Sequence, residues 1–163
     1  MIIYSIGHSN ADAGFFLALL ERHLIDTLVD TRSQPYSRYT PQFNLEALKR
    51  SLSEVNVEYV YLGDLIGGRP EDPEYYYGNG KVDYDLLATA PFYLAGVERL
   101  LELAATARVA FMCTEADFTK CHRYWLITRT LLARDVEVHH ILHSGELASS
   151  ELSEFEAPQL SLF

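Results

Sequence analysis

Short apolar runs alternate with amphipathic stretches along the whole chain, which leaves few folds open to it. The apolar runs have the length of buried strands, and the amphipathic stretches carry apolar residues at helical spacing. This alternation predicts βαβ units, in which helices cover both faces of a mostly parallel sheet. We therefore expect a single three-layer α/β domain with a sheet of about five strands. The expected strands are residues 1–6, 25–29, 58–62, 108–112 and 137–142, and the expected helices are residues 12–23, 44–56, 90–107 and 123–134.

The composition agrees with one globular domain. The chain has 163 residues, 48% of them hydrophobic, and a chain of this length can bury a sizeable core. No apolar run approaches the ~20 residues of a membrane-spanning helix, and the N-terminus lacks the basic flank of a signal peptide. The two cysteines, Cys113 and Cys121, are too few for a disulfide framework. We expect a cytoplasmic protein with two free thiols and no membrane partner.

The net charge of -10 argues against a basic surface that holds nucleic acid. Any contact with a polyanion must therefore be local. The charge is unevenly distributed, because residues 144–163 contain four glutamates and no basic residue. We expect an α/β domain over residues 1–143 and an acidic tail over residues 144–163.

Polar and reactive side chains collect where the expected strands end. Open parallel sheets bind their ligands outside the carboxyl ends of the strands, so we expect these side chains to form one site. They are His8 and Ser9 after the first strand, Asp30, Arg32, Ser33 and Arg38 after the second, and Cys113, Glu115, Cys121, His122 and Arg123 after the fourth.

Two chemical schemes use the cysteines. In the first, Cys113 or Cys121 is a thiolate nucleophile that a helix N-terminus and a nearby histidine activate. In the second, Cys113, Cys121 and His122, together with His8, hold a metal ion, although their spacing differs from the usual zinc patterns. Cys113 also has a structural interpretation as a small buried residue at the end of an apolar strand.

A third scheme uses the arginines to hold a phosphate or a carboxylate. The expected anion-binding residues are Arg32, Arg38, Arg123, Ser9 and Ser33, and the expected acid–base residues are Glu115, Asp30 and His8. As alternatives, Asp30 and Arg32 form an ion pair that only positions a loop, and His8 only caps a helix. The glycine-rich motifs of nucleotide-triphosphate hydrolases and dinucleotide-binding domains, and the nucleophile elbow of α/β-hydrolases, are absent from the sequence.

The segment of residues 63–85 interrupts the alternation. It contains Gly67, Gly68, three consecutive tyrosines at residues 75–77 and the sequence GNG at residues 78–80. Loops of this length are usually functional or disordered, and the aromatic residues argue against disorder. We expect either a lid packed on the domain or a loop that contacts substrate.

Several of these residues lie in motifs that resemble the family known as domain of unknown function 488. The motifs are YSIGHS at residues 4–9, LVDTRS at residues 28–33 followed by Pro35 and Arg38, QFN at residues 42–44, MCTE at residues 112–115 and CHR at residues 121–123. The resemblance extends from about residue 2 to residue 142, with Thr31 and Thr114 as conservative variants. It implies a small α/β domain whose signature residues are those of the expected site, and it implies no particular activity.

A fainter likeness points to the rhodanese sulfurtransferases. The strand that ends in Cys113 and the VDTR sequence at residues 29–32 look like parts of that fold. The loop after Cys113 is longer here, however, and the acid-containing sequence TEAD at residues 114–117 replaces the small and basic residues of that fold. Glu115 would disfavour a persulfide or another anionic intermediate.

The last five residues resemble the peptide by which bacterial replication and repair proteins bind the DNA sliding clamp. Gln159 supplies an amide, and Leu160, Leu162 and Phe163 supply spaced apolar anchors. A peptide that tethers the protein to a ring around DNA raises its local concentration without a basic surface. The alternative is that this peptide packs on its own domain.

The leading hypothesis is therefore a bacterial DNA-maintenance enzyme that the sliding clamp recruits and that acts on DNA or a nucleotide. The first alternative is a thiol-dependent sulfur-transfer enzyme without a connection to DNA. The second is a non-catalytic adaptor in which the polar cluster binds an anion or a metal. The sequence leaves the reaction itself open.

Overall fold

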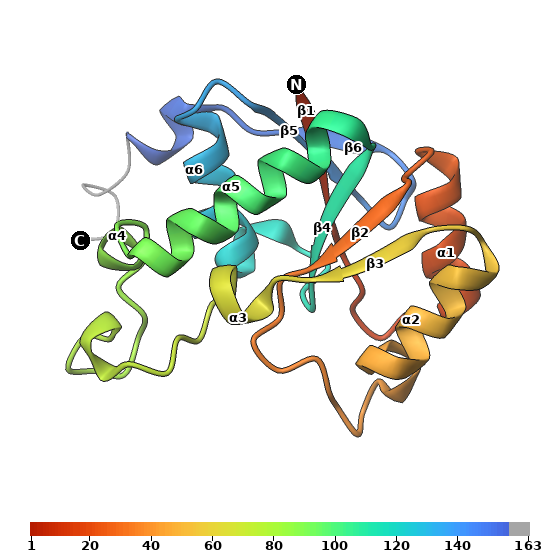
Figure 1. Ribbon diagram of the computed structural model, residues 1–163, viewed down its shortest axis with the longest axis horizontal. Helices are drawn as coiled ribbons and strands as arrows, with labels where there is room; N and C mark the ends of the chain where they lie inside the picture. The colour runs from red at the N-terminus through yellow and green to blue at the C-terminus, as the bar shows by residue number, and fades with distance from the viewer. Residues whose placement is uncertain (157–163) are drawn as a thin grey trace.

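The computed structural model describes residues 1–156, which form one six-stranded sheet (Figure 1). The strands are β1 (Ile2–Gly7), β2 (Thr27–Asp30), β3 (Glu58–Tyr61), β4 (Val109–Cys113), β5 (Glu137–Ile141) and β6 (Leu147–Ser149). Their order is β3-β2-β4-β1-β5-β6, and all neighbours are parallel except β5 and β6. The predicted α/β class and mostly parallel sheet are confirmed. The sixth strand was not predicted.

Helices cover both faces of this sheet and give three layers (Figure 1). The helices α1 (Ala13–Arg22) and α2 (Leu45–Glu54) pack on one face, where their leucines join Tyr4 and Ile6 of β1 in one apolar cluster. The helices α5 (Pro91–Thr106) and α6 (Arg129–Leu132) pack on the other face, in a cluster that contains Ile3 of β1. Successive residues of β1 thus enter different clusters, as the period of a strand requires.

The longest helix, α5, follows simple sequence rules. It begins with Pro91 in its first turn, where the missing N–H of proline removes no helical hydrogen bond. Its buried residues Tyr93, Gly96, Val97 and Leu100 recur at intervals of three and four, which places them on one helical face against the sheet.

The helix expected over residues 123–134 forms in two parts. Its first part is a π-helical turn, Arg123–Thr128, and its second part is α6. The hydroxyl of Thr128 donates to the carbonyl of Arg123 at 2.6 Å, inside the wider turn. Such turns are frequent at functional sites, and this one begins immediately after Cys121 and His122.

The segment of residues 63–85 is ordered and partly helical. It contains α3 (Gly63–Ile66), a 3-10 turn at Pro73–Tyr75 and α4 (Tyr84–Leu87). Tyr75 and Tyr84 pack against the apolar cluster under α5, whereas Tyr77 is 52% exposed. The segment therefore packs on the domain.

The first part of the expected acidic tail is also folded. It contributes β6 and a 3-10 turn at Leu152–Phe155, and Phe155 lies 4.6 Å from the ring of Tyr124. Residues 159–163, which carry the expected clamp-binding peptide, lie outside the described residues. Within residues 1–156, no helix combines the length and the hydropathy needed to cross a membrane.

Candidate functional site

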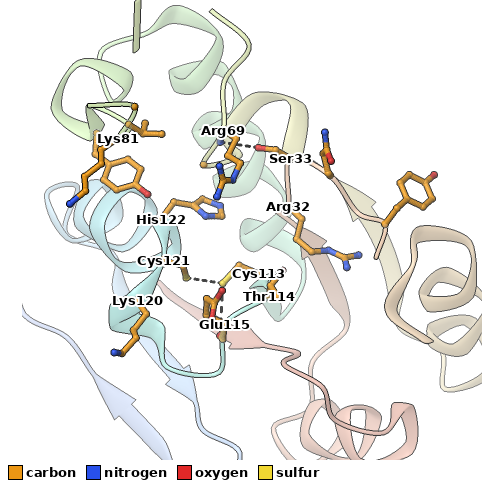
Figure 2. A pocket seen from close by; sticks show the side chains of 16 residues that line it. Arg32, Ser33, Arg69, Lys81, Cys113, Thr114, Glu115, Lys120, Cys121 and His122 are labelled. Atoms are coloured by element: carbon orange, nitrogen blue, oxygen red, sulfur yellow. Dashed lines mark hydrogen bonds between the residues drawn. The ribbon is translucent and has the colours of Figure 1, made fainter. Parts of the chain in front are cut away.

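A cavity of about 670 Å³ opens at the carboxyl ends of β2 and β4, where the sequence placed the site (Figure 2). Six of the predicted residues are in its lining, namely Arg32, Ser33, Cys113, Glu115, Cys121 and His122. The loop that leads from β4 passes so close to β1 that a Cβ atom on Gly7 would lie 1.7 Å from the carbonyl oxygen of Glu115. The glycine thus allows β1 to approach the loop that carries Glu115.

The two thiols face each other at the base of this cavity (Figure 2). Their sulfur atoms are 2.8 Å apart. Cys113 is the last residue of β4 and is 2% exposed, whereas Cys121 is partly exposed. Burial raises the pKa of Cys113, so this thiol keeps its proton and donates to Cys121. The hydrogen bond from Cys113, followed by the charge of Arg123, lowers the pKa of Cys121 to about 6. Cys121 is therefore the thiolate of the pair at neutral pH.

Arg123 is a fully buried cation beside Cys121. Its guanidinium donates to the hydroxyl of Ser5 at 3.1 Å and to the carbonyl of Glu115 at 2.7 Å, and its Nε has no hydrogen-bond partner among residues 1–156. None of these acceptors carries a charge, and a buried charge without a counter-ion is costly. A thiolate on Cys121 supplies the missing negative charge. Arg123 does not line the cavity, so the structure does not place it as an anion-binding residue.

A buried chain of hydrogen bonds connects Arg123 to the far side of the domain. Ser5 Oγ lies 2.5 Å from Nδ1 of His140, and Nε2 of His140 lies 2.8 Å from Ser150 Oγ. The ring of Phe118 stacks on His140 at 3.8 Å, and burial lowers the pKa of this histidine to about 3. This support was not predicted from the sequence, where its only signal is that Ser5 and His140 are polar residues inside apolar strands.

Asp30 and Arg32 form a buried ion pair. The guanidinium donates from Nε and Nη2 to the two carboxylate oxygens at 2.9 and 2.8 Å, and Tyr59 Oη donates to Asp30 at 2.6 Å. Arg32 also donates to the carbonyl of Phe43. Asp30 is fully buried and lines neither cavity described here. These contacts favour the structural interpretation of the pair, and Arg32 reaches the cavity wall with its charge already compensated.

The two histidines of the predicted site are neutral at pH 7. His8 donates from Nδ1 to the carbonyl of Ser9 at 2.6 Å and accepts from Arg32 at Nε2. His122 donates from Nε2 to the carbonyl of Thr31 at 3.1 Å. Burial lowers the pKa of each to about 4. Neither ring forms a hydrogen bond with a thiol among the described residues, and the groups that lower the pKa of Cys121 are Cys113 and Arg123 instead of the base that the first scheme assumed.

The cations that line the cavity are largely ones that the sequence analysis did not single out. Arg69 and Lys81 come from the segment of residues 63–85, and Lys120 precedes Cys121; all three are exposed. The predicted Arg38 points elsewhere: it donates to the hydroxyl of Tyr39 and is absent from the lining. Only the expectation that residues 63–85 contact substrate could have indicated Arg69 and Lys81.

A second cavity of about 420 Å³ adjoins the first. It is lined by His8, Ser9, Ser37, Tyr39 and Thr40, together with Arg32, Gln34, Tyr36, Thr114 and Glu115, which also line the first cavity. Ser9 has a positive φ of 50°, which turns the chain sharply after β1. Ser33 instead accepts a hydrogen bond from the amide of Arg69 at 3.0 Å and so ties the segment of residues 63–85 to the site.

The predicted metal ligands are not arranged as a metal site. Within residues 1–156, no group of three or more histidine, cysteine, aspartate or glutamate side chains has a suitable geometry. The two thiols contact each other, His122 is bonded to Thr31, and His8 lines the neighbouring cavity instead. The set of Cys113, Cys121 and His122 therefore does not fit a bound metal.

Comparison with known proteins gives one match. A family model with the description "Domain of unknown function DUF488" matches residues 13–130. No curated protein and no solved structure matches the chain. The matched residues include both thiols, Arg32, Arg69 and the buried Arg123.

Proposed function

The chain belongs to the family of domain of unknown function DUF488, and we propose from its site that it is a thiol-dependent enzyme with Cys121 as the nucleophile. The observation that carries this proposal is the contact between Cys113 and Cys121, backed by a buried arginine that lacks a carboxylate partner within residues 1–156. A thiolate is both the nucleophilic form of cysteine and the charge that this arginine needs.

The substrate of the proposed enzyme carries a phosphate or another anionic group. Arg69, Lys81 and Lys120 line the same cavity as Cys121, and none of them forms an ion pair with a described carboxylate. Unpaired cations around a cavity attract anions and raise their local concentration. They thus take the anion-binding role that the sequence analysis gave to Arg38 and Arg123.

The proposed step is a nucleophilic displacement. The thiolate of Cys121 attacks an electrophilic atom of the substrate, and a new bond joins this atom to Sγ. The bond to the leaving group breaks, and its electron pair departs with the leaving group. Cys113 stays protonated and holds the thiolate in place until the attack.

We further propose that the substrate is DNA or a nucleotide, and that residues 159–163 bring the protein to the sliding clamp. This part rests on the resemblance of Gln159, Leu160, Leu162 and Phe163 to clamp-binding peptides. Purified clamp should retain the full chain in a pull-down and should not retain a chain with Leu160→Ala and Phe163→Ala. Ser161→Ala, which changes no anchor residue, is the matched control. Equal retention of all three chains, or no retention of the full chain, would refute recruitment.

Two alkylating reagents test the nucleophile and the anion capture together. With an ordinary thiolate, anionic iodoacetate reacts more slowly than neutral iodoacetamide. Here we expect the ratio to favour iodoacetate, because cations surround Cys121. Lys81→Ala and Lys120→Ala should return the ratio to that of a free thiol, whereas Lys49→Ala, on the exposed surface of α2, should not change it. Labelling that persists in Cys121→Ser would refute the assignment of the nucleophile.

Sulfur transfer is a second candidate, and the proximity of the two thiols favours it. Thiosulfate would transfer its outer sulfur atom to Cys121, sulfite would leave with the electron pair of the broken S–S bond, and Cys121 would carry a persulfide. Glu115 lines the cavity, and its carboxylate would repel the negative charge of the persulfide. A gain of one sulfur atom on Cys121 after incubation with thiosulfate, seen by intact mass spectrometry, would support sulfur transfer over action on DNA, and an unchanged mass would exclude thiosulfate as donor.

A further inference from the structure

The two cavities lie side by side at the carboxyl ends of the central strands, and together they are the groove considered for a ligand. Five residues line both of them, namely Arg32, Gln34, Tyr36, Thr114 and Glu115. Each cavity alone has a volume within the range of small-molecule sites, roughly 300–1,000 Å³. The groove is therefore longer than a single small ligand requires, and its two ends differ in chemistry.

One end of the groove is aromatic. Tyr39 lines the second cavity and Tyr36 lines both cavities, and the two side chains are 77% and 61% exposed. The guanidinium of Arg38 lies 4.9 Å from the centre of the Tyr39 ring and donates to its hydroxyl, and the amide of Tyr39 donates to Ser37 Oγ. These contacts hold the Tyr39 ring in place while most of its surface faces solvent. Exposed, positioned aromatic rings are suited to stack on a planar ligand.

The other end of the groove is cationic. It carries the unpaired Arg69, Lys81 and Lys120, whereas the charge of Arg32 between the two ends is neutralised by Asp30. The carboxylate in the lining is Glu115, which lines both cavities, and the thiolate of Cys121 is the other negative charge. A ligand that fits both ends has planar apolar groups at the tyrosines and anionic groups at the three cations.

We propose that this groove binds a short stretch of single-stranded nucleic acid, with bases stacked on Tyr36 and Tyr39 and phosphates at Arg69, Lys81 and Lys120. The inference rests on the proposed function, which places a phosphate-bearing substrate in the cavity of Cys121. It adds that this substrate is a single strand. Stacking platforms beside a cationic groove bind single strands without reading their sequence. A duplex keeps its bases stacked inside, so its bases cannot stack on the tyrosines.

Fluorescence anisotropy with an end-labelled oligothymidylate of about six nucleotides, at low salt, tests this proposal. The wild-type chain should bind the single strand more tightly than a duplex of the same length. Because stacking contributes ~1–3 kcal/mol per base, Tyr36→Ala and Tyr39→Ala should each weaken binding about 5- to 150-fold, and the double variant should weaken it at least about 30-fold. Tyr77→Ala, an exposed tyrosine outside both cavities, is the matched control and should bind like the wild type. A matching oligouridylate in the same assay separates DNA from RNA.

Charge variants test the cationic end independently. Each phosphate contact adds about 0.7 to the slope of log affinity against log salt concentration for a single strand. Lys81→Ala and Lys120→Ala should each reduce that slope by about this amount, and Glu115→Gln should tighten binding because it removes the opposing charge. Equal affinity for the duplex, an unchanged affinity of the double tyrosine variant, or no strand binding at all would overturn the inference.

The same samples keep the two proposals distinguishable. If Cys121 is alkylated as expected and no strand binds, the thiol proposal stands and the groove proposal fails. If the strand binds through the tyrosines and Cys121 reacts like a free cysteine, the groove proposal stands and the thiol proposal fails. The tyrosine changes are at exposed positions, so the folded state should persist.

Discussion

Replacing Cys113 by alanine should make Cys121 a more basic thiol. In the wild-type chain the hydrogen bond from Cys113 is the largest cause that lowers the pKa of Cys121 to about 6, and the charge of Arg123 adds to it. Cys113→Ala removes the donor and leaves the arginine. Cys113→Ser keeps an O–H donor at nearly the same place and is the matched variant.

The size of the effect follows from the strength of one hydrogen bond to a charged group. An ordinary cysteine has a pKa of about 8.5, so a pKa of about 6 corresponds to about 3 kcal/mol of extra stabilisation of the thiolate, at ~1.4 kcal/mol per pH unit. A hydrogen bond to a charged group contributes ~1.5–3 kcal/mol. Its loss should therefore raise the pH midpoint of Cys121 reactivity by about one to two pH units.

The assay is the rate of iodoacetamide labelling between pH 5 and pH 9, read residue by residue by mass spectrometry. The midpoint is the diagnostic quantity, because a more basic thiolate is also more nucleophilic, with a Brønsted slope of about 0.4–0.5. The wild-type midpoint should be near 6, that of Cys113→Ser should rise less than that of Cys113→Ala, and Cys121→Ala should abolish the profile. A midpoint that does not move in Cys113→Ala, or a profile that belongs to Cys113 instead, would refute the assignment of donor and thiolate.

Three predictions concern stability, measured as the free energy of unfolding in urea. Asp30→Asn leaves a buried guanidinium without its counter-ion and should cost about 3–5 kcal/mol. Asp85→Asn removes the carboxylate of an exposed pair and should cost under about 1 kcal/mol. Equal losses in the two variants would contradict the role of burial. Gly7→Ala forces a Cβ against a backbone oxygen and should prevent stable folding, but Gly14→Ala, with open space around it, should stabilise α1 or leave it unchanged. Between pH 6.5 and 4 the free energy of unfolding should fall, because the buried histidines of lowered pKa take up protons when the chain unfolds. In His140→Asn the fall in the free energy of unfolding down to pH 4 should be smaller by about 3 kcal/mol. An unchanged slope would show that His140 is protonated in the folded state.

The alternation of strands and helices was enough to predict the fold class and the edge of the sheet at which the site lies. It was not enough to predict β6, because Leu147–Ser149 is short and follows acidic and small residues. That strand exists because β5 offers it an antiparallel partner, with His140 opposite Ala148. Pairing of this kind depends on the tertiary structure and leaves no periodic pattern in three residues.

The roles of individual charged residues were harder to predict than their location. Arg32, Arg38 and Arg123 follow strands in the same way in the sequence, yet the structure places them differently. Arg32 is buried against Asp30, Arg38 bonds to Tyr39 at an exposed position, and Arg123 is fully buried beside Cys121. Arg123 is directed by Ser5, which is 118 residues away in the sequence. Arg32 and Arg38 bond to the nearby Asp30 and Tyr39, but the fold decides which of the two pairs is buried. Cations such as Lys81 and Lys120 enter the site for the same reason, because a long loop and a short 3-10 turn fold over it.

The position of β1 in the sheet has a consequence for the way the chain can assemble. Its neighbours are β4 and β5, which are more than 100 residues away in the sequence. While the protein is being synthesised, the first strand must therefore wait until about residue 141 has left the ribosome before it has both partners. Contacts of such long range slow folding, and a nascent chain with an unpaired apolar strand is a natural client for a chaperone. Truncation after α5 should for the same reason yield a fragment without a central sheet.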